Sequence, residues 1–272
     1  MGRGTEQLLW LAILDPAVIL TTIFFFALAS IYDLKTREVP DKVWLAFLPI
    51  GIALTAFRLY VLPSLILLTA ISVVLTVAIS FVMFYFGLFG GADAKAIMCL
   101  GATIPLTLTS YDSIFGYVFP FLPITVTITS YLCSALVILW IVGRNLTHHF
   151  QHGKMFDGLS NESSWKKTLA FVTGYLVPQS KLRSIFYLYP MEEVVDTSEG
   201  SRRALKVYTS AEEDREMVVS TLCEKLKQMG YEGEVWVTPG LPHMIFLLLG
   251  LIITLIFGDP IFTTVVRLAA HH

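Results

Sequence analysis

Two aspartates of this sequence stand beside long apolar segments, where an ionisable side chain is costly and often functional. Asp33 follows the first apolar run in IYDLKTREVPD, and Asp93 precedes a later run in FGGADAK. Two carboxyl groups held close together share one proton, because both cannot be ionised at short range. Such a pair can take a proton from water and help an amine to leave. The two residues therefore indicate peptide hydrolysis if the fold brings them together.

Each aspartate also has a purely structural interpretation. Asp33 alone could be a solvated charge that ends a helix at the membrane interface. Asp93 alone could be an N-cap, a position where Asp is favoured. The pairing of the two favours function, as does the Gly90-Gly91 dipeptide before Asp93. Glycine lets the backbone bend and lets an extended peptide approach closely.

The overall composition indicates which kind of fold positions these two carboxyls. The chain has 272 residues, of which 55% are apolar and only 15% are charged, with a mean hydropathy of +0.70. The formal net charge of -2 excludes a broadly basic nucleic-acid binder. These values predict an all-α polytopic membrane protein.

A spanning helix needs about 20 mostly apolar residues, and the sequence predicts six of them. The second and fourth are short. The six are Leu8–Tyr32, Val43–Phe57, one within Leu59–Phe89, Ala94–Leu108, Ile114–Val142 and one between Glu234 and Asp259.

The distribution of Lys and Arg predicts the orientation in the membrane. The first loop carries Lys35, Arg37 and Lys42, and the long segment from Arg144 to Lys227 holds twelve basic residues. These segments are therefore expected to be cytoplasmic, with both termini outside. Asp33 and Asp93 then lie at the same, cytoplasmic face of the membrane.

The composition also predicts three parts of the chain. These are a membrane domain over residues 1–143, a small α+β cytoplasmic domain over residues 144–240, and a sixth transmembrane helix with a tail over residues 241–272. Within the cytoplasmic domain, Ala211–Met229 is expected to form an amphipathic helix. Leu205–Tyr208 and Glu234–Thr238 are expected to form strands.

Two motifs carry a resemblance to a known family. They are Asp33-Leu34-Lys35-Thr36-Arg37-Glu38-Val39-Pro40 and Gly90-Gly91-Ala92-Asp93-Ala94-Lys95. Together they resemble the type IV prepilin peptidases, the G-x-G-D class of intramembrane aspartyl proteases. The six spans, with a soluble domain before the last, resemble the archaeal preflagellin peptidases within that class. Ala92 stands where many members have the second glycine.

The resemblance implies that Asp33 and Asp93 are the catalytic aspartates and that Gly90, Gly91, Ala92 and Lys95 support the motif or the substrate. It implies cleavage of a short basic leader from preflagellins or prepilin-like precursors at the cytoplasmic face of the cell membrane. The expected partners are these precursors and membrane lipid, without nucleic acid. Neither a cofactor nor a metal is expected.

Three other functions stay open at this point. A signal-peptide-peptidase-like protease would usually have more spans and carry its aspartates on adjacent helices. A proton-coupled transporter would favour carboxyls near the bilayer midplane and internal repeats, and no repeat is visible. A non-catalytic assembly factor of a surface filament would need no intact motifs.

Several other polar residues are expected to be structural. The cluster His148, His149 and His152 could bind a metal, but a solvated group beside the membrane is the preferred interpretation. We expect Asp15, Asp112 and Asp259 to end helices at the outer interface.

Overall fold

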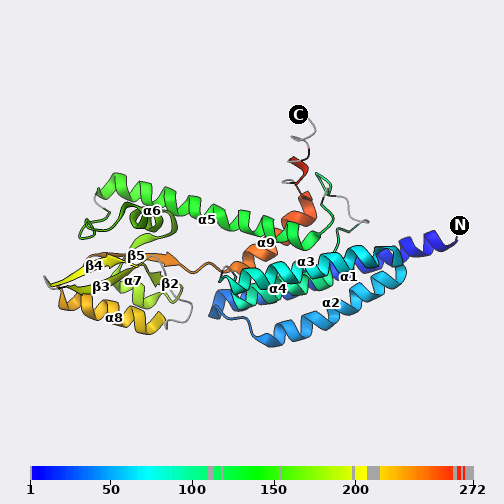
Figure 1. Cartoon of the computed structure of the whole chain (residues 1–272), viewed down its shortest axis with the longest axis horizontal. Coiled ribbons are helices and arrows are strands. Elements are labelled where there is room, and N and C mark those ends of the chain that lie inside the picture. Colours follow the sequence, from blue (N-terminus) through cyan, green and yellow to red (C-terminus); the bar gives the residue numbers. More distant parts are fainter. Residues whose placement is uncertain are drawn as a thin grey trace. The chain divides into compact units, whose positions relative to one another are not determined.

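The computed structural model describes residues 2–87, 89–108, 113–117, 119–153, 155–197, 200–206, 215–259, 262–264 and 266. The chain divides into two compact units, one formed by Met1–Ser134 with Pro242–His272 and the other by Ala135–Leu241. The sequence-based boundaries are 143/144 and 240/241. One helix, α5 (Leu122–His152), contributes its first part to one unit and the remainder to the other (Figure 1).

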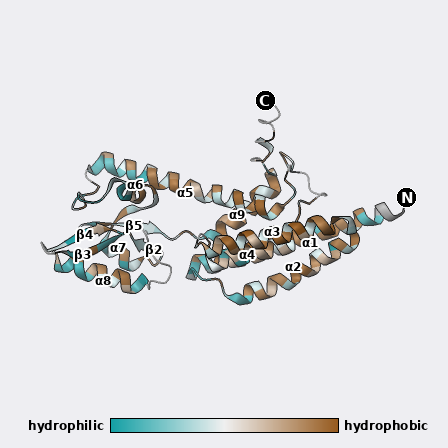
Figure 2. Ribbon diagram, in the orientation of Figure 1, coloured by the Kyte–Doolittle hydropathy of each residue, from teal (hydrophilic) through white to brown (hydrophobic). Residues whose placement is uncertain are grey.

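The first unit is helical and strongly apolar. Its other helices are α1 (Gly2–Thr36), α2 (Asp41–Val61), the short 3-10 helix η1 (Pro63–Leu65), α3 (Ile66–Tyr85), α4 (Gly91–Thr103) and α9 (His243–Phe257). Figure 2 shows apolar residues along most of the length of these helices. In the part of the chain that the structure describes, four helices are long and apolar enough to cross a membrane: Glu6–Thr36, Asp41–Val61, Pro63–Tyr85 and Leu122–His152.

The six predicted spans match six helices, but two of these are short. Helix α4 has 13 residues and α9 has 15. At a rise of about 1.5 Å per residue, both are shorter than a hydrocarbon core of about 30 Å. The count of six spans therefore stays a prediction.

Helix α4 packs closely between α2 and α3. The Thr55 hydroxyl on α2 donates to the backbone carbonyl of Ala102, with 2.8 Å between the two oxygens. A side chain at Gly51 would overlap Thr103, and one at Gly101 would crowd Thr76. Small residues therefore allow the close approach that holds α4, and with it Asp93, in the unit.

Helix α5 differs from the predicted span at both ends. It begins at Leu122 rather than Ile114, with Pro123 in its first turn, where a missing N–H costs nothing. It continues to His152 and ends before Gly153, whose φ of 80° suits the left-handed conformation that terminates helices. The polar residues after Val142 therefore continue the helix instead of ending it.

Two acidic residues have surroundings that the sequence does not reveal. Asp15 does not end a helix: it lies inside α1, and its Oδ1 is 3.6 Å from Nε of Arg58 on α2, with both side chains buried. Asp259 lies just past the end of α9, but it is fully buried and accepts the backbone N–H of Phe119 at 2.7 Å. Asp112 lies outside the described residues.

The second unit is the small α+β domain that the sequence predicts. Its sheet has the antiparallel order β1-β5-β2, and β3 and β4 form a separate hairpin. The elements are α6 (Ser164–Thr173), β1 (Tyr175–Pro178), α7 (Gln179–Ser184), β2 (Leu188–Pro190), β3 (Glu192–Thr197), β4 (Gly200–Leu205), α8 (Arg215–Gln228) and β5 (Glu234–Pro239).

The structure confirms two of the three elements predicted for this unit and displaces the third. The strand at residues 234–238 is confirmed as β5. The strand expected at 205–208 is displaced, because β4 ends at Leu205 and residues 207–214 lie outside the described part. The amphipathic helix is confirmed from Arg215 to Gln228 as α8.

Alternation along the strands gives the sheet two apolar faces. Val177, Val235 and Val237 pack in one cluster with residues of α7 and α8. Leu176 and Trp236 point to the other face and pack in a second cluster with Ala170 of α6. The sheet is thus covered by helices on both faces, as Figure 1 shows.

Candidate active site

Asp33 lies one turn before the end of α1. The backbone N–H of Arg37 donates to the Asp33 carbonyl at 3.1 Å, and Arg37 has a φ of 59°, so the chain leaves the helix there in a left-handed turn. The Asp33 side chain is half-buried. The end of an apolar helix therefore holds this carboxyl next to polar groups instead of in the middle of the helix bundle.

Asp93 lies in the first turn of α4. The backbone N–H of Gly90, the N-cap residue, donates to Asp93 Oδ2 at 3.1 Å, which closes a capping interaction. Asp93 is therefore not the N-cap residue that the sequence suggested: it is the third residue of the helix, and one of its carboxylate oxygens accepts the N–H of the N-cap. The other oxygen, Oδ1, faces a different element.

The start of α9 meets both aspartates. The backbone N–H of Met244 donates to Asp33 Oδ2 at 3.0 Å. Nδ1 of His243 lies 3.3 Å from Asp93 Oδ1. Asp33 also lies within electrostatic range of Asp93 and His243. Two carboxyls that are distant in the sequence therefore converge on two consecutive residues of a third helix.

A helix start is a suitable place for these carboxyls. The first N–H groups of a helix have no partner within the helix, and the helix dipole places partial positive charge there. Asp33 accepts one of these N–H groups, that of Met244, across the helix bundle. Pro242, which precedes α9, fixes where the helix begins and thus which N–H groups are available.

The glycines of the second motif have different surroundings. A Cβ at Gly90 would lie 3.1 Å from Asp93 Oδ2, closer than ordinary van der Waals contact. A Cβ at Gly91 would meet its nearest neighbour, a ring carbon of Phe84, at 3.7 Å, which is an ordinary contact. The Gly90 φ of -68° is open to any residue. Glycine at position 90 therefore provides room for the Asp93 carboxylate and not an unusual backbone turn.

The two other motif residues have structural partners. Ala92 packs against the apolar core of the first unit. Lys95 Nζ lies 2.5 Å from Oδ1 of Asp41, and both side chains are substantially exposed. Lys95 thus joins the start of α4 to the start of α2 near the site.

Sequence reasoning missed His243 and Met244. Both sit at the beginning of an apolar helix, where one histidine carries no recognisable motif. The only local signal is the preceding Pro239-Gly240-Leu241-Pro242 segment, which breaks the chain before α9. Their contribution depends on contacts with residues that are distant in the sequence. Met244 and Asp33, for example, are 211 positions apart.

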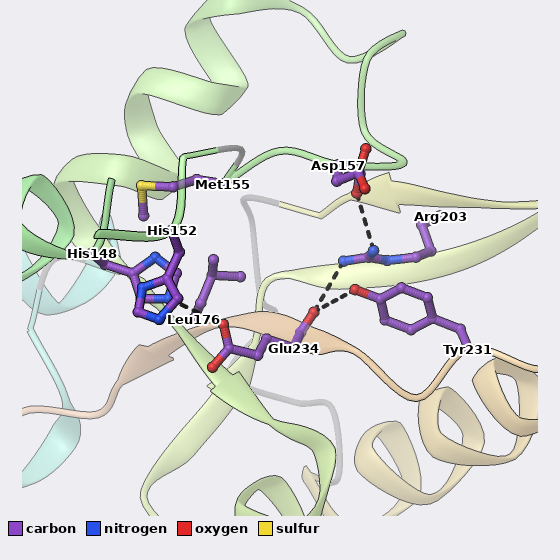
Figure 3. A pocket seen from close by; sticks show the side chains of 8 residues that line it. All are labelled: His148, His152, Met155, Asp157, Leu176, Arg203, Tyr231 and Glu234. Carbon is purple, nitrogen blue, oxygen red and sulfur yellow. Dashed lines mark hydrogen bonds and ion pairs between the residues drawn. The ribbon is translucent and has the colours of Figure 1, made fainter. Parts of the chain in front are cut away.

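The second unit has a pocket of about 390 Å³ whose lining includes His148, His152 and Glu234. Nε2 of His148 lies 3.2 Å from Glu234 Oε2, and the two imidazole rings stack at 4.6 Å (Figure 3). Among the described residues, no group of three or more His, Cys, Asp or Glu side chains is placed to hold a metal ion. The histidines thus form a polar wall of this pocket.

A buried ion pair next to the pocket stabilises the second unit. Arg203 on β4 donates to both carboxylate oxygens of Glu192 on β3, each at 2.8 Å. Glu192 also accepts the backbone N–H of Trp236 on β5 at 2.7 Å. Burial raises the pKa of the Glu192 carboxyl, and the Arg203 guanidinium acts in the opposite direction. The pair ties the hairpin to the sheet.

The geometry of the first site fits the hydrolysis of a peptide bond. Two carboxyls that meet at the start of one helix can divide the roles of proton acceptor and proton donor between them.

Comparison with known proteins agrees with this chemistry. Residues 20–142 match the model of the type IV leader peptidase family. Residues 166–260 match the model described as archaeal peptidase A24 C-terminus type II. Asp33 and Asp93 lie within the first match, and His243 and Met244 lie within the second. The two matches together cover most of the chain.

Curated relatives align over nearly the whole length. A preflagellin peptidase of Methanocaldococcus jannaschii is 28% identical over 246 residues, which is 86% of this chain and 91% of the relative. A preflagellin peptidase of Methanococcus voltae is 26% identical over 247 residues, 88% of this chain and 94% of the relative. One from Methanococcus maripaludis is 24% identical over 242 residues, 86% of this chain and 92% of the relative. The chain is thus similar to the type IV leader peptidase family over residues 20–142 and to the archaeal peptidase A24 C-terminus over residues 166–260.

Proposed function

We propose that this peptidase is an aspartyl endopeptidase that removes the short basic leader from preflagellins or similar prepilin-like precursors. The relatives named preflagellin peptidase support the substrate class. The observation that carries the proposed mechanism is the meeting of Asp33 and Asp93 at the start of α9. Asp33 and Asp93 are the catalytic pair, and Gly90 gives the Asp93 carboxylate its room.

In this mechanism the ionised member of the pair takes a proton from a water molecule, which attacks the scissile carbonyl. The protonated member polarises that carbonyl and then donates its proton to the leaving amine. The Met244 N–H and the His243 imidazole hold the two carboxyls in place while the proton moves. Removal of either carboxyl leaves no partner for this exchange.

The proposed topology has six spans, both termini outside the cell and the aspartates at the cytoplasmic face. The excess of Lys and Arg in the first loop and in the second unit supports this orientation. The short helices α4 and α9 then begin near that face, with Asp93 and His243 in their first turns. A basic leader on the cytoplasmic side would reach this depth directly.

A cleavage assay tests the proposal. The full chain, purified in detergent, would be incubated with a precursor peptide that has a basic leader ending in Gly followed by an apolar helix. Asp33→Asn and Asp93→Asn are each expected to lower the cleavage rate by at least about a thousandfold. Asn keeps the size of Asp and an oxygen that can accept the Met244 N–H, so both variants are expected to fold.

The control is Asp196→Asn, an exposed position in the second unit, for which we expect the wild-type rate. Mass spectrometry identifies the products, and cleavage after the Gly defines the leader. Near wild-type cleavage by either of the two site variants would reject the catalytic pair. A folded wild type that cleaves no leader over a range of pH would reject the substrate class.

A further inference from the structure

We propose that His243 is a positioning residue of the proteolytic site and that it holds the Asp93 carboxylate through its Nδ1 atom. This inference rests on the proposed catalytic role of Asp93. It adds a third side chain to a site that the sequence motifs describe by two aspartates alone.

The imidazole of His243 is largely enclosed. Its side chain is 16% exposed, and that of Asp93 is 19% exposed. Neither ring nitrogen has a hydrogen bond of good geometry to another described residue, and both atoms are shielded from solvent. The nearest charged partner is Asp93, whose Oδ1 lies 3.3 Å from Nδ1. Burying a polar ring costs free energy unless the ring has a polar partner. The contact between Nδ1 and the Asp93 carboxylate provides that partner.

Aromatic neighbours fix the orientation of the ring. The Tyr131 ring on α5 lies 5.0 Å from the His243 ring, and the Phe89 ring lies 6.5 Å away. Phe89 and Tyr131 are themselves stacked at 5.6 Å. The two rings limit rotation of the imidazole out of its plane, and a 180° flip within that plane would replace Nδ1 by a carbon next to Asp93 and lose the polar contact. The stack thus serves as a rigid support for one polar contact.

The contact has a consequence for both carboxyls. Nδ1 can donate to Asp93 when it carries the proton, either in the Nδ1–H tautomer or in the imidazolium. The next residue, Met244, donates its backbone N–H to Asp33. One turn of α9 therefore sets the position of both members of the pair. Catalytic geometry must be held within about 0.5 Å, which loose side chains do not achieve.

Three substitutions at one position separate the polar contact from the packing. Asn places its amide nitrogen where Nδ1 stands, whereas Gln places its amide one bond further from the backbone. Phe keeps the ring and its stacking but has no donor. We expect His243→Phe to lower kcat for leader cleavage by about tenfold or more with KM changed by less than about twofold, because only the positioning of the pair is lost.

The ranking of the three variants by kcat is the more informative result. His243→Asn is expected to recover most of the lost kcat, and His243→Gln is expected to recover less. A role limited to filling space would reverse the order, since Phe fits the aromatic stack better than Asn does. His149→Phe, an exposed histidine of the second unit, is the matched control and should keep the wild-type kcat.

The outcomes distinguish this inference from the proposed function. If wild type cleaves the leader, Asp93→Asn does not, and His243→Phe keeps the wild-type kcat, the positioning role is overturned while the catalytic pair stands. Equal kcat values for the Asn, Gln and Phe variants would overturn it as well. If His243→Phe does not fold, the kcat values of His243→Asn and His243→Gln decide between the two interpretations. Equal kcat values for these two variants would reject the positioning role.

Discussion

At the scale of single residues, the carboxyl of Asp93 is held from two sides. Gly90 donates its backbone N–H to Oδ2, and His243 approaches Oδ1. Two fixed contacts leave the carboxylate little freedom to rotate. Any atom added next to Oδ2 must therefore displace the whole group or the helix start that holds it.

The two glycines of the motif give a matched pair of variants. Gly90→Ala places a Cβ 3.1 Å from Asp93 Oδ2, whereas Gly91→Ala makes only an ordinary contact at 3.7 Å. A shift of the catalytic group by a few tenths of an ångström is expected to lower kcat by about tenfold for Gly90→Ala. Gly91→Ala should stay within about twofold of wild type. Steady-state cleavage of the leader peptide measures both, and equal losses would contradict the assigned role of Gly90.

At the scale of elements, a buried ion pair links α1 to α2. Asp15 and Arg58 have side chains that are 1% and 6% exposed. Removing one member of a buried pair leaves the other charge uncompensated, whereas replacing both by apolar groups is often tolerated. The pair thus fixes which face of α2 packs on α1, and α1 carries Asp33.

Stability measurements test this link. Arg58→Met and Asp15→Leu are each expected to lower the free energy of unfolding by about 3–5 kcal/mol. The double variant Asp15→Leu with Arg58→Met should be close to wild type. Lys42→Met, at an exposed position of the same helix, should stay within about 0.5 kcal/mol. Thermal unfolding in detergent measures all four, and additive losses in the double variant would show that the two residues do not interact.

At the scale of the whole molecule, one helix belongs to both units. Helix α5 has 31 residues, or about 46 Å of helix, which exceeds a hydrocarbon core of about 30 Å. Its later residues pack within the second unit, where Asn145 donates to the carbonyls of Phe171 and Gly174. The polar part of α5 is therefore built into the folded domain and does not end the span early.

Single cysteines test the proposed topology. The side chains of Ser64, Lys42 and Ser160 are exposed. The variants are made in a Cys133→Ala protein, which should react little with maleimide because Cys99 and Cys223 are buried. In intact cells a membrane-impermeant maleimide is expected to label Ser64→Cys but neither Lys42→Cys nor Ser160→Cys. Permeabilised cells should allow all three to react. Labelling of Lys42→Cys in intact cells would place the first loop outside and overturn the orientation.

The sequence by itself determined the features that rest on local patterns. Long apolar runs predicted the helices, the change in composition predicted an α+β domain, and the two aspartate motifs predicted the peptidase family, which the family matches confirm. Each of these signals is carried by residues that are neighbours along the chain. Hydrophobic periodicity and the signals that start and stop helices extend over a few residues, so a linear pattern is enough to reveal them.

Only the tertiary structure decided which groups complete the site. His243 and Met244 reach the aspartates across the helix bundle, Lys95 pairs with Asp41, and Arg58 pairs with Asp15. None of these pairings has a local signature, because side chains far apart in the sequence meet only after the helices pack. The sequence places the two carboxyls at helix ends, and packing decides that the start of α9 holds them both.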